Sequence, residues 1–222
     1  MINILMTKKV DFSFFPKKYF FIQYYDFLFI KYSKLYKKPI LNDQLIFTSW
    51  NGMKGFLYNF EYFSFQKKKI YIVGEKTLSF IKKNFPYSFL LQKNYVQDII
   101  DEIIKNKSNQ YYDWFCVKKN ITKNEEKFLK KKKINRLEVY QAFMNPQKIQ
   151  NLSHYHGIIF FSPYGVQSFF LKNKIHHNTK TEIFAIGKTT AKFISNFLTK
   201  KVWYPKIPSI KEVFYLVKNF FI

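Results

Sequence analysis

Cysteine is almost absent from this chain of 222 residues, since Cys116 is the only one. A disulfide framework and a cysteine-rich zinc site are therefore excluded. Glycine is also scarce, and because no G-x-G-x-x-G sequence occurs, a dinucleotide site of that kind is unsupported. Gly187-Lys188-Thr189 resembles the end of a phosphate-binding loop. However, the first glycine of that motif is replaced by Glu182, and the residues between are strand-like and apolar.

Long apolar runs are lacking as well. The most apolar stretch, residues 19–32, is interrupted by Gln23, Asp26 and Lys31, so it is too short for a membrane-spanning helix. The first residues contain no apolar segment that would indicate a secretory leader. We therefore expect a cytoplasmic protein without membrane segments.

Acidic residues are few. The chain has 14 Asp and Glu against 38 Lys and Arg, which gives a formal net charge of +24. Such a balance attracts polyanions, whether nucleic acid, anionic membrane or a metabolite with several carboxylates. However, the lysines are spread along the chain, and the joint excess of Lys, Phe and Tyr indicates a drift in composition. The charge alone does not distinguish a solvated surface from a binding surface.

Two pairs of segments repeat one pattern. The sequence IFAIGKTTAKFI (183–194) has a counterpart in IYIVGEKTLSFI (70–81), and each predicts a buried strand that ends in glycine, a polar turn and a helix. The preceding segments, LIFTSWNGMKGF (45–56) and IIFFSPYGVQSF (158–169), also correspond, and they keep the same spacing to the later pair. We interpret the chain as two halves of related build.

The predicted fold is α/β, with two lobes that are each a mostly parallel sheet flanked by helices. Strands alternate with helical patterns, such as the amphipathic residues 96–104 and the capping-box pairs Thr122–Glu125 and Ser209–Glu212. Two extended segments bracket a central block, which predicts two connecting strands between the domains. We expect a first domain of residues 1–26 and 145–222, an inserted domain of residues 33–137, and linker strands at 27–32 and 138–144.

Ligands of open parallel sheets bind beyond the carboxyl ends of the strands, where helix N-termini present free N–H groups. The hydroxyl-bearing residues at such positions are Thr48, Ser49, Thr77, Ser162, Thr189 and Thr190. Each could equally be only a helix N-cap, and Pro163 makes Ser162 a good cap in either case. The recurrence in both halves favours a shared anionic ligand in a cleft between the lobes.

Other candidate sites are weaker. His154 and His156 could present two imidazoles on one strand face, but no carboxylate or cysteine cluster accompanies them, so no metal site is predicted. The basic runs 67–69 and 130–133 are typical of solvated faces. Most aromatic residues occupy apolar strand and helix positions rather than positions for base stacking, so no nucleic acid is expected.

The segments LIFTSWNGM, IYIVGEKT, LEVYQAF, IIFFSPYGV and IFAIGKTTA, in this order and spacing, resemble the uroporphyrinogen-III synthase family. The resemblance covers about residues 45–205 and implies two α/β lobes joined by a two-stranded ladder. It implies cyclisation of hydroxymethylbilane to uroporphyrinogen III in heme biosynthesis, with loss of water, inversion of ring D and no cofactor. The substrate is a small molecule with eight carboxylates, and we expect a monomer.

The resemblance also implies roles for individual residues. Tyr140 matches a cleft tyrosine that would hydrogen-bond or protonate the leaving hydroxyl; otherwise it is a linker aromatic that meets water. Ser49, Thr77, Ser162 and Thr190 match positions that bind carboxylates. The predicted substrate-binding set is Thr7, Lys8, Thr48, Ser49, Thr77, Ser162, Gly187, Thr189 and Thr190.

The chain departs from the family pattern in two places. Residues 10–25 predict no clear helix after the first strand, and Trp50 stands where a small residue or proline is typical. The alternative hypothesis is a non-catalytic two-lobed protein that binds a polyanion, including nucleic acid, in the same cleft. Nucleic-acid binding would show a steep salt dependence and little dependence on Tyr140, Thr77 or Thr190.

Overall fold

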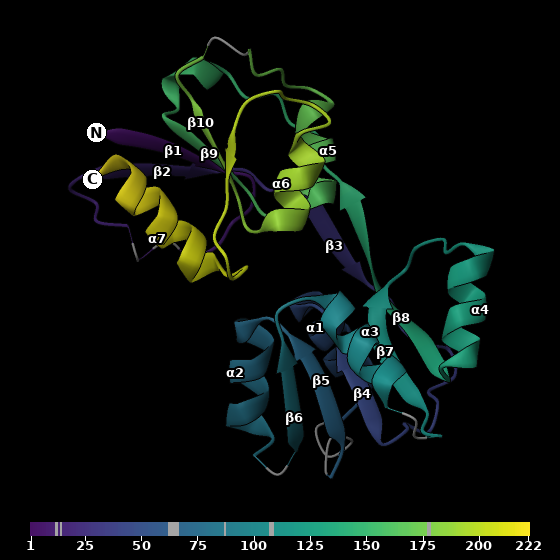
Figure 1. Cartoon of the computed structure of the whole chain (residues 1–222). Coiled ribbons are helices and arrows are strands. Elements are labelled where there is room, and N and C mark those ends of the chain that lie inside the picture. The colour runs from purple at the N-terminus through teal and green to yellow at the C-terminus, as the bar shows by residue number, and fades with distance from the viewer. Residues whose placement is uncertain (12, 14, 62–66, 87, 107–108, 177–178) are drawn as a thin grey trace. The chain divides into compact units, whose positions relative to one another are not determined.

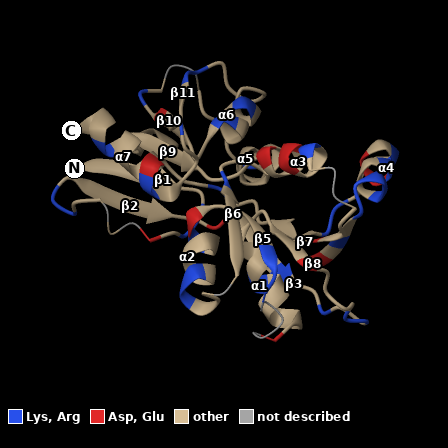
Figure 2. Cartoon of the chain, turned by 60° about the horizontal axis from the view of Figure 1, so that its bottom comes forward, with Lys and Arg blue, Asp and Glu red and all other residues tan. Residues whose placement is uncertain are grey.

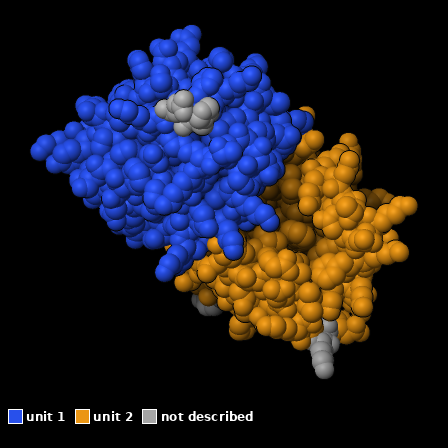
Figure 3. Space-filling model, turned by 45° about the horizontal axis from the view of Figure 1, so that its top comes forward, with its two compact units in different colours: residues 1–29, 143–222 blue, residues 30–142 orange. Residues whose placement is uncertain are grey.

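A computed structural model describes the chain except for residues 12, 14, 62–66, 87, 107–108 and 177–178. The chain forms two compact units (Figure 3). Unit 1 comprises Met1–Phe29 and Phe143–Ile222, and unit 2 comprises Ile30–Ala142. Each unit contains one sheet with helices packed against it (Figure 1). The prediction of an α/β protein with two mostly parallel sheets flanked by helices is confirmed.

Unit 1 is built on a five-stranded sheet of order β11-β10-β9-β1-β2, in which all neighbours are parallel. Its strands are β1 (Ile2–Met6), β2 (Phe20–Tyr24), β9 (Gly157–Phe160), β10 (Glu182–Ala185) and β11 (Val202–Trp203). Its helices are η2 (Leu152–His154), α5 (Pro163–Phe170), α6 (Lys188–Ile194) and α7 (Ile210–Phe221). Successive strand residues point to opposite faces. Leu5 and Ile158 therefore pack with α5 and α6, whereas Ile4 and Ile159 pack with α7 (Figure 1).

Unit 2 is built on a six-stranded sheet of order β3-β8-β7-β4-β5-β6, parallel from β8 to β6. Its strands are β3 (Leu28–Tyr32), β4 (Gln44–Phe47), β5 (Lys69–Val73), β6 (Phe89–Lys93), β7 (Tyr112–Val117) and β8 (Ile134–Met144). Its helices are α1 (Trp50–Asn59), α2 (Glu75–Asn84), α3 (Val96–Lys105) and α4 (Lys123–Lys131). Helices α1 and α2 share one buried core with the sheet, and α3 and α4 share the other.

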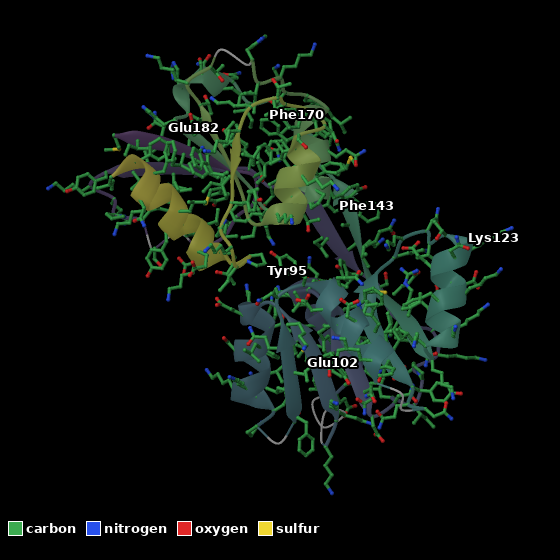
Figure 4. All side chains as sticks on the ribbon, viewed as in Figure 1. Tyr95, Glu102, Lys123, Phe143, Phe170 and Glu182 are labelled. Atoms are coloured by element: carbon green, nitrogen blue, oxygen red, sulfur yellow. The ribbon has the colours of Figure 1, made fainter. Side chains whose placement is uncertain are left out.

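Strands β3 and β8 are hydrogen-bonded neighbours, and each contains a point where the chain passes from one unit to the other. In unit 2, the Ser33 amide donates to the Val139 carbonyl at 3.0 Å. In unit 1, the Asn145 amide donates to the Phe27 carbonyl at 2.9 Å. The rings of Phe29 and Phe143 stack there with centroids 4.9 Å apart, and Figure 4 labels Phe143.

Two strands had no counterpart in the sequence prediction. Residues 10–25 were expected to lack a clear helix, and β2 forms within them as a parallel partner of β1. Both β2 and β6 are edge strands and partly exposed, so neither shows the strong apolar pattern of a buried strand. Helix α6 ends at Ile194, where the bond from the Phe197 amide to the Ile194 carbonyl, 2.9 Å, tightens the last turn.

The helix starts follow local side-chain chemistry. The predicted Thr122–Glu125 capping box is present, with Glu125 N to Thr122 Oγ1 at 3.2 Å and Thr122 N to Glu125 Oε2 at 2.8 Å. At α7, Ser209 Oγ accepts from Glu212 N at 3.1 Å, and only this half of the predicted box forms among the described residues. No helix in the described part of the chain has the length and apolar character needed to cross a membrane.

A buried asparagine in unit 2 fixes the chain just after β3. Asn59 is 2% exposed, and its Nδ2 donates to the carbonyls of Gly55 at 2.8 Å and Ser33 at 2.9 Å. Its Oδ1 accepts from the Leu35 amide at 2.7 Å. One side chain therefore ties the end of α1 to the segment that follows β3.

Asn173 makes the same set of bonds in unit 1. Its Nδ2 donates to the carbonyls of Phe169 at 2.9 Å and Gln147 at 2.7 Å, and its Oδ1 accepts from the Ile149 amide at 2.8 Å. We call Asn59 and Asn173 the asparagine clamps. The repeat alignment that pairs Ser49 with Ser162 would pair Asn59 with the residue before Asn173, so it does not reveal that the two asparagines correspond.

Candidate functional site

The first turns of α1 and α5 have nearly identical caps. Ser49 (φ −160, ψ 155) and Ser162 (φ −164, ψ 154) precede the helices. Their Oγ atoms accept from Gly52 N at 3.0 Å and Gly165 N at 3.1 Å. Both serines are therefore N-caps. Because each Oγ accepts this bond, its own proton remains available for a further acceptor.

In unit 2 the Ser49 hydroxyl has a specific partner. Its Oγ lies 3.1 Å from the hydroxyl of Tyr140, which is 9% exposed. Burial raises the pKa of Tyr140, and the hydrogen bond with Ser49 opposes this effect. The phenol therefore keeps its proton throughout the neutral pH range. A protonated phenol beside a hydroxyl that is itself polarised by a helix N–H is a suitable hydrogen-bond donor or acid.

A β-bulge gives Tyr140 its orientation. Cys116 pairs with Glu138 and Val117 pairs with Tyr140, so Val139 is the extra residue on β8. Consecutive strand residues normally face opposite sides of a sheet. Here Val139 and Tyr140 both belong to the core beneath α1 and α2, because the bulge re-aims the strand locally.

Two glycines let α1 approach β7 and β8 closely. A Cβ added at Gly52 would lie 2.4 Å from the Phe115 carbonyl oxygen, and one at Gly55 would lie 2.5 Å from Val139 Cγ2. No larger residue fits at either position without a shift of the helix. The glycines therefore keep Ser49 at hydrogen-bond distance from Tyr140.

A second tyrosine lies in the same region. Tyr32 donates to Asn51 Oδ1 at 3.4 Å, and burial raises the pKa of Tyr32, with a further contribution from nearby Tyr140. Tyr32, Asn51, Ser49 and Tyr140 form a polar cluster at the start of α1. The sequence analysis did not find Tyr32 or Asn51, because their neighbourhood depends on strand pairing rather than on a local motif.

Thr77 and Thr190 occupy the third positions of α2 and α6 and are 1% and 3% exposed. The N-cap interpretation is wrong for both, because their helices begin after Gly74 and Gly187. Neither hydroxyl bonds to another residue in the part of the chain that the structure describes. Their hydroxyl oxygens are not among the fully buried oxygen atoms that lack a partner, so each keeps some access to solvent and is available to a ligand.

The two glycines before these threonines are required for different reasons. Gly74 has φ +95, a conformation that side-chain-bearing residues rarely adopt. Gly187 is extended, but an added Cβ would lie 2.8 Å from Pro208 Cβ. Glycine is therefore needed at both equivalent positions of the repeat, at Gly74 for its backbone conformation and at Gly187 for lack of space for a side chain.

The remaining predicted residues differ in how free their side chains are to bind a ligand. Thr7 is 4% exposed and its hydroxyl donates to the Ile159 carbonyl at 3.0 Å, while Thr48 Oγ1 accepts from Trp114 Nε1 at 3.1 Å. The Thr7 hydroxyl therefore donates its proton within the fold, whereas the Thr48 hydroxyl is an acceptor and keeps its own proton available. Lys8 and Thr189 are exposed.

The possible metal ligands are dispersed. His156 Nδ1 accepts from the Asn3 amide at 3.0 Å, a bond that ties the residue before β9 to β1. Among the described residues, no group of three or more His, Cys, Asp or Glu is placed to hold a metal ion. Basic residues lie on helices, strands and loops of both units (Figure 2).

Two α/β units with hydroxyl-bearing helix starts beyond parallel strands define a class of proteins suited to anionic ligands. The sequence profile of the family described as uroporphyrinogen-III synthase HemD matches residues 34–215. The chain therefore belongs to the uroporphyrinogen-III synthase family, cyclising enzymes of heme biosynthesis that act on a small molecule. No curated protein matches the chain in sequence.

Solved structures agree with the fold. The crystal structure of uroporphyrinogen-III synthetase from Helicobacter pylori is 15% identical, with a TM-score of 0.66 over 99% of this chain and 100% of that chain. A mutant uroporphyrinogen III synthase from Thermus thermophilus is 13% identical, with a TM-score of 0.63 over 99% of this chain and 97% of that chain. At these identities the likeness supports the architecture alone.

Proposed function

We propose that this protein is an active uroporphyrinogen-III synthase that converts hydroxymethylbilane to uroporphyrinogen III and water without a cofactor. Membership of the family supports the reaction class. The observation that carries the proposal is the buried Tyr140 hydroxyl held 3.1 Å from Ser49, the cap of α1. This pair supplies a protonated donor that is fixed in direction, as departure of a hydroxyl group requires.

One chain of hydrogen bonds would orient the proton of Tyr140, which is the proton transferred. Gly52 N–H donates to Ser49, and in the direction that the mechanism requires Ser49 donates to Tyr140, which donates its proton to the hydroxyl that leaves ring A. The leaving group departs as water and an azafulvene cation remains. Ring D attacks through its substituted carbon, and the spiro intermediate opens and closes again with ring D reversed. The proton that the pyrrole loses at the end restores Tyr140, so the overall change is loss of one water.

Substrate binding would use the helix starts of each unit. Ser162 in unit 1 has the same cap geometry as Ser49 in unit 2, and Thr77 and Thr190 add further hydroxyls. Because the proton of Ser49 is directed to Tyr140, the N–H groups of the first turn of α1 would bind the carboxylate there. Helix N–H groups and hydroxyls together suit carboxylates, and a basic protein attracts a substrate with eight of them. Because unaided closure does not invert ring D, positioning of the substrate is the main task of these contacts.

Thr77→Val and Thr190→Val are expected to raise KM about three- to tenfold, since each removes one hydrogen bond to a carboxylate. The melting temperature should stay nearly the same, because valine has almost the shape of threonine and the hydroxyl that it replaces has no partner in the described protein. Steady-state kinetics and thermal unfolding check the two parts. A large loss of stability with unchanged KM would show that these residues serve only the helices.

Product isomer analysis tests the proposed function. Purified protein is supplied with hydroxymethylbilane, and the oxidised products are separated into type I and type III uroporphyrins. We expect mainly type III, at a rate well above that of a reaction without protein. Type I alone at the uncatalysed rate would rule out the synthase and favour the non-catalytic polyanion-binding protein.

A further inference from the structure

Trp50, Lys54 and Lys76 form a cluster at the start of α1 and α2 in unit 2, which we call the tryptophan–lysine cluster. The Nζ of Lys76 lies 5.1 Å from the centroid of the Trp50 ring, and that of Lys54 lies 6.0 Å from it. Trp50 is half-buried, and its ring meets Phe80 of α2 edge-on at 5.2 Å. The indole is therefore fixed against α2 and holds two cations near one ring.

The two ammonium groups have no anionic partner among the described residues. Neither Lys54 nor Lys76 forms a salt bridge or a hydrogen bond with any residue that the structure describes. The first turn of α1 contains no acidic residue, and that of α2 contains only Glu75. A flexible lysine normally loses rotamer freedom when it binds an anion. Because contact with the indole already restricts the lysine rotamers, less rotamer freedom is lost when an anion binds.

The cluster adjoins the residues of the proposed site. Trp50 follows Ser49 directly, and Lys76 lies between Gly74 and Thr77 in the first turn of α2. The N–H groups of both first turns add partial positive charge, which favours an anion beside the lysines. The geometry points to the tryptophan–lysine cluster as a binding site for one carboxylate side chain of the tetrapyrrole substrate, with Lys76 and Lys54 as ligands and Trp50 as a positioning residue.

This assignment rests on the proposed function for the identity of its ligand. Its test therefore measures both turnover of hydroxymethylbilane and equilibrium binding of uroporphyrin III, a stable octacarboxylate. The variants are Lys76→Gln, Lys54→Gln, Trp50→Leu and Trp50→Phe in the full chain. Lys83→Gln is the matched control, because Lys83 is an exposed lysine in the last turn of the same helix and loses the same charge.

We expect Lys76→Gln to raise KM and the Kd for uroporphyrin III about three- to tenfold and to make both less sensitive to salt, with the effect on KM rather than kcat. Trp50→Leu should weaken binding although it removes no charge, and Trp50→Phe should restore much of it. Unchanged binding in Lys76→Gln would overturn the assignment. Equal weakening in Lys76→Gln and Lys83→Gln would also overturn it, since net charge would then explain the result.

The two readouts separate this assignment from the proposed function. If the wild-type protein forms type III product but Lys76→Gln behaves like wild type, the synthase stands and the carboxylate site falls. If the wild-type protein gives no type III product but binds uroporphyrin III in a Lys76-dependent way, the site stands and the synthase falls. Absence of both turnover and binding would overturn both.

Discussion

Tyr140→Phe is expected to lower kcat for type III product about 10- to 100-fold while leaving the melting temperature within a few degrees of wild type. The phenylalanine ring fills the same core space beneath α1, so packing is kept. What is lost is the proton donor that lies 3.1 Å from Ser49. Steady-state kinetics with isomer analysis measures the loss, and near wild-type turnover would remove Tyr140 from the mechanism.

Tyr155→Phe is the matched control for this variant. Tyr155 is also buried, at 7% exposed, and its hydroxyl bonds to Gln23 Oε1 at 2.5 Å, but it lies in unit 1 and has no proposed role in the reaction. It should keep kcat within about twofold of wild type. A similar fall in both variants would indicate a general effect of losing a buried tyrosine hydroxyl.

The pH dependence of the wild-type enzyme provides a second check on Tyr140. Because burial raises the pKa of this phenol above its ordinary value of about 10, loss of its proton cannot lower kcat at neutral pH. We expect no decline from Tyr140 until the pH exceeds that value. A decline below about pH 8 that disappears in Tyr140→Phe would contradict the assigned protonation state.

Asn59→Ala is expected to destabilise unit 2 by roughly 3–5 kcal/mol. The substitution removes three hydrogen bonds and leaves the Leu35 amide and the carbonyls of Ser33 and Gly55 without this partner. Denaturant unfolding followed by fluorescence measures the change, since Trp50 and Trp114 lie in unit 2 and Trp203 lies in unit 1. Single-tryptophan backgrounds let the two units be followed separately.

Asn84→Ala is the control for the asparagine clamp. Asn84 also donates to the carbonyl four residues earlier, Phe80 O at 2.8 Å, but it is exposed and makes no second tie among the described residues. It should cost less than about 1 kcal/mol. Asn173→Ala should destabilise unit 1 as Asn59→Ala destabilises unit 2. If Asn59→Ala costs no more than Asn84→Ala, the clamps contribute little to stability.

Features set by local chemistry were predictable from the sequence. The caps at Ser49 and Ser162 and the capping box at Thr122 follow from the residue type and the apolar period after it. The alternation of strands and helices indicated the α/β class for the same reason. Strands β2 and β6 escaped prediction. Both are partly exposed edge strands with a weak apolar pattern, although the edge strand β3, which is also partly exposed, was predicted.

Features set by distant contacts were not predictable in this way. The bond between Ser49 and Tyr140 joins residues 91 positions apart and depends on a bulge that no local pattern indicates. The burial of Thr77 and Thr190 follows from how their helices pack on the sheets, although their place in the repeat was visible. The tryptophan–lysine cluster was likewise hidden, because Lys76 meets Trp50 only after α1 and α2 dock on the same sheet.

The discontinuity of unit 1 has a consequence for how the protein is made. Unit 2 is fully synthesised once residue 142 has left the ribosome, whereas β1 pairs with β9, Ile4 opposite Gly157, which is synthesised later. During translation, β1 and β2 therefore lack their later partner β9. Their apolar residues stay exposed, and one edge of β1 stays unpaired, while the inserted unit folds. Slow translation between residues 142 and 160 would prolong this exposure, and aggregation of nascent chains should be most sensitive to that interval.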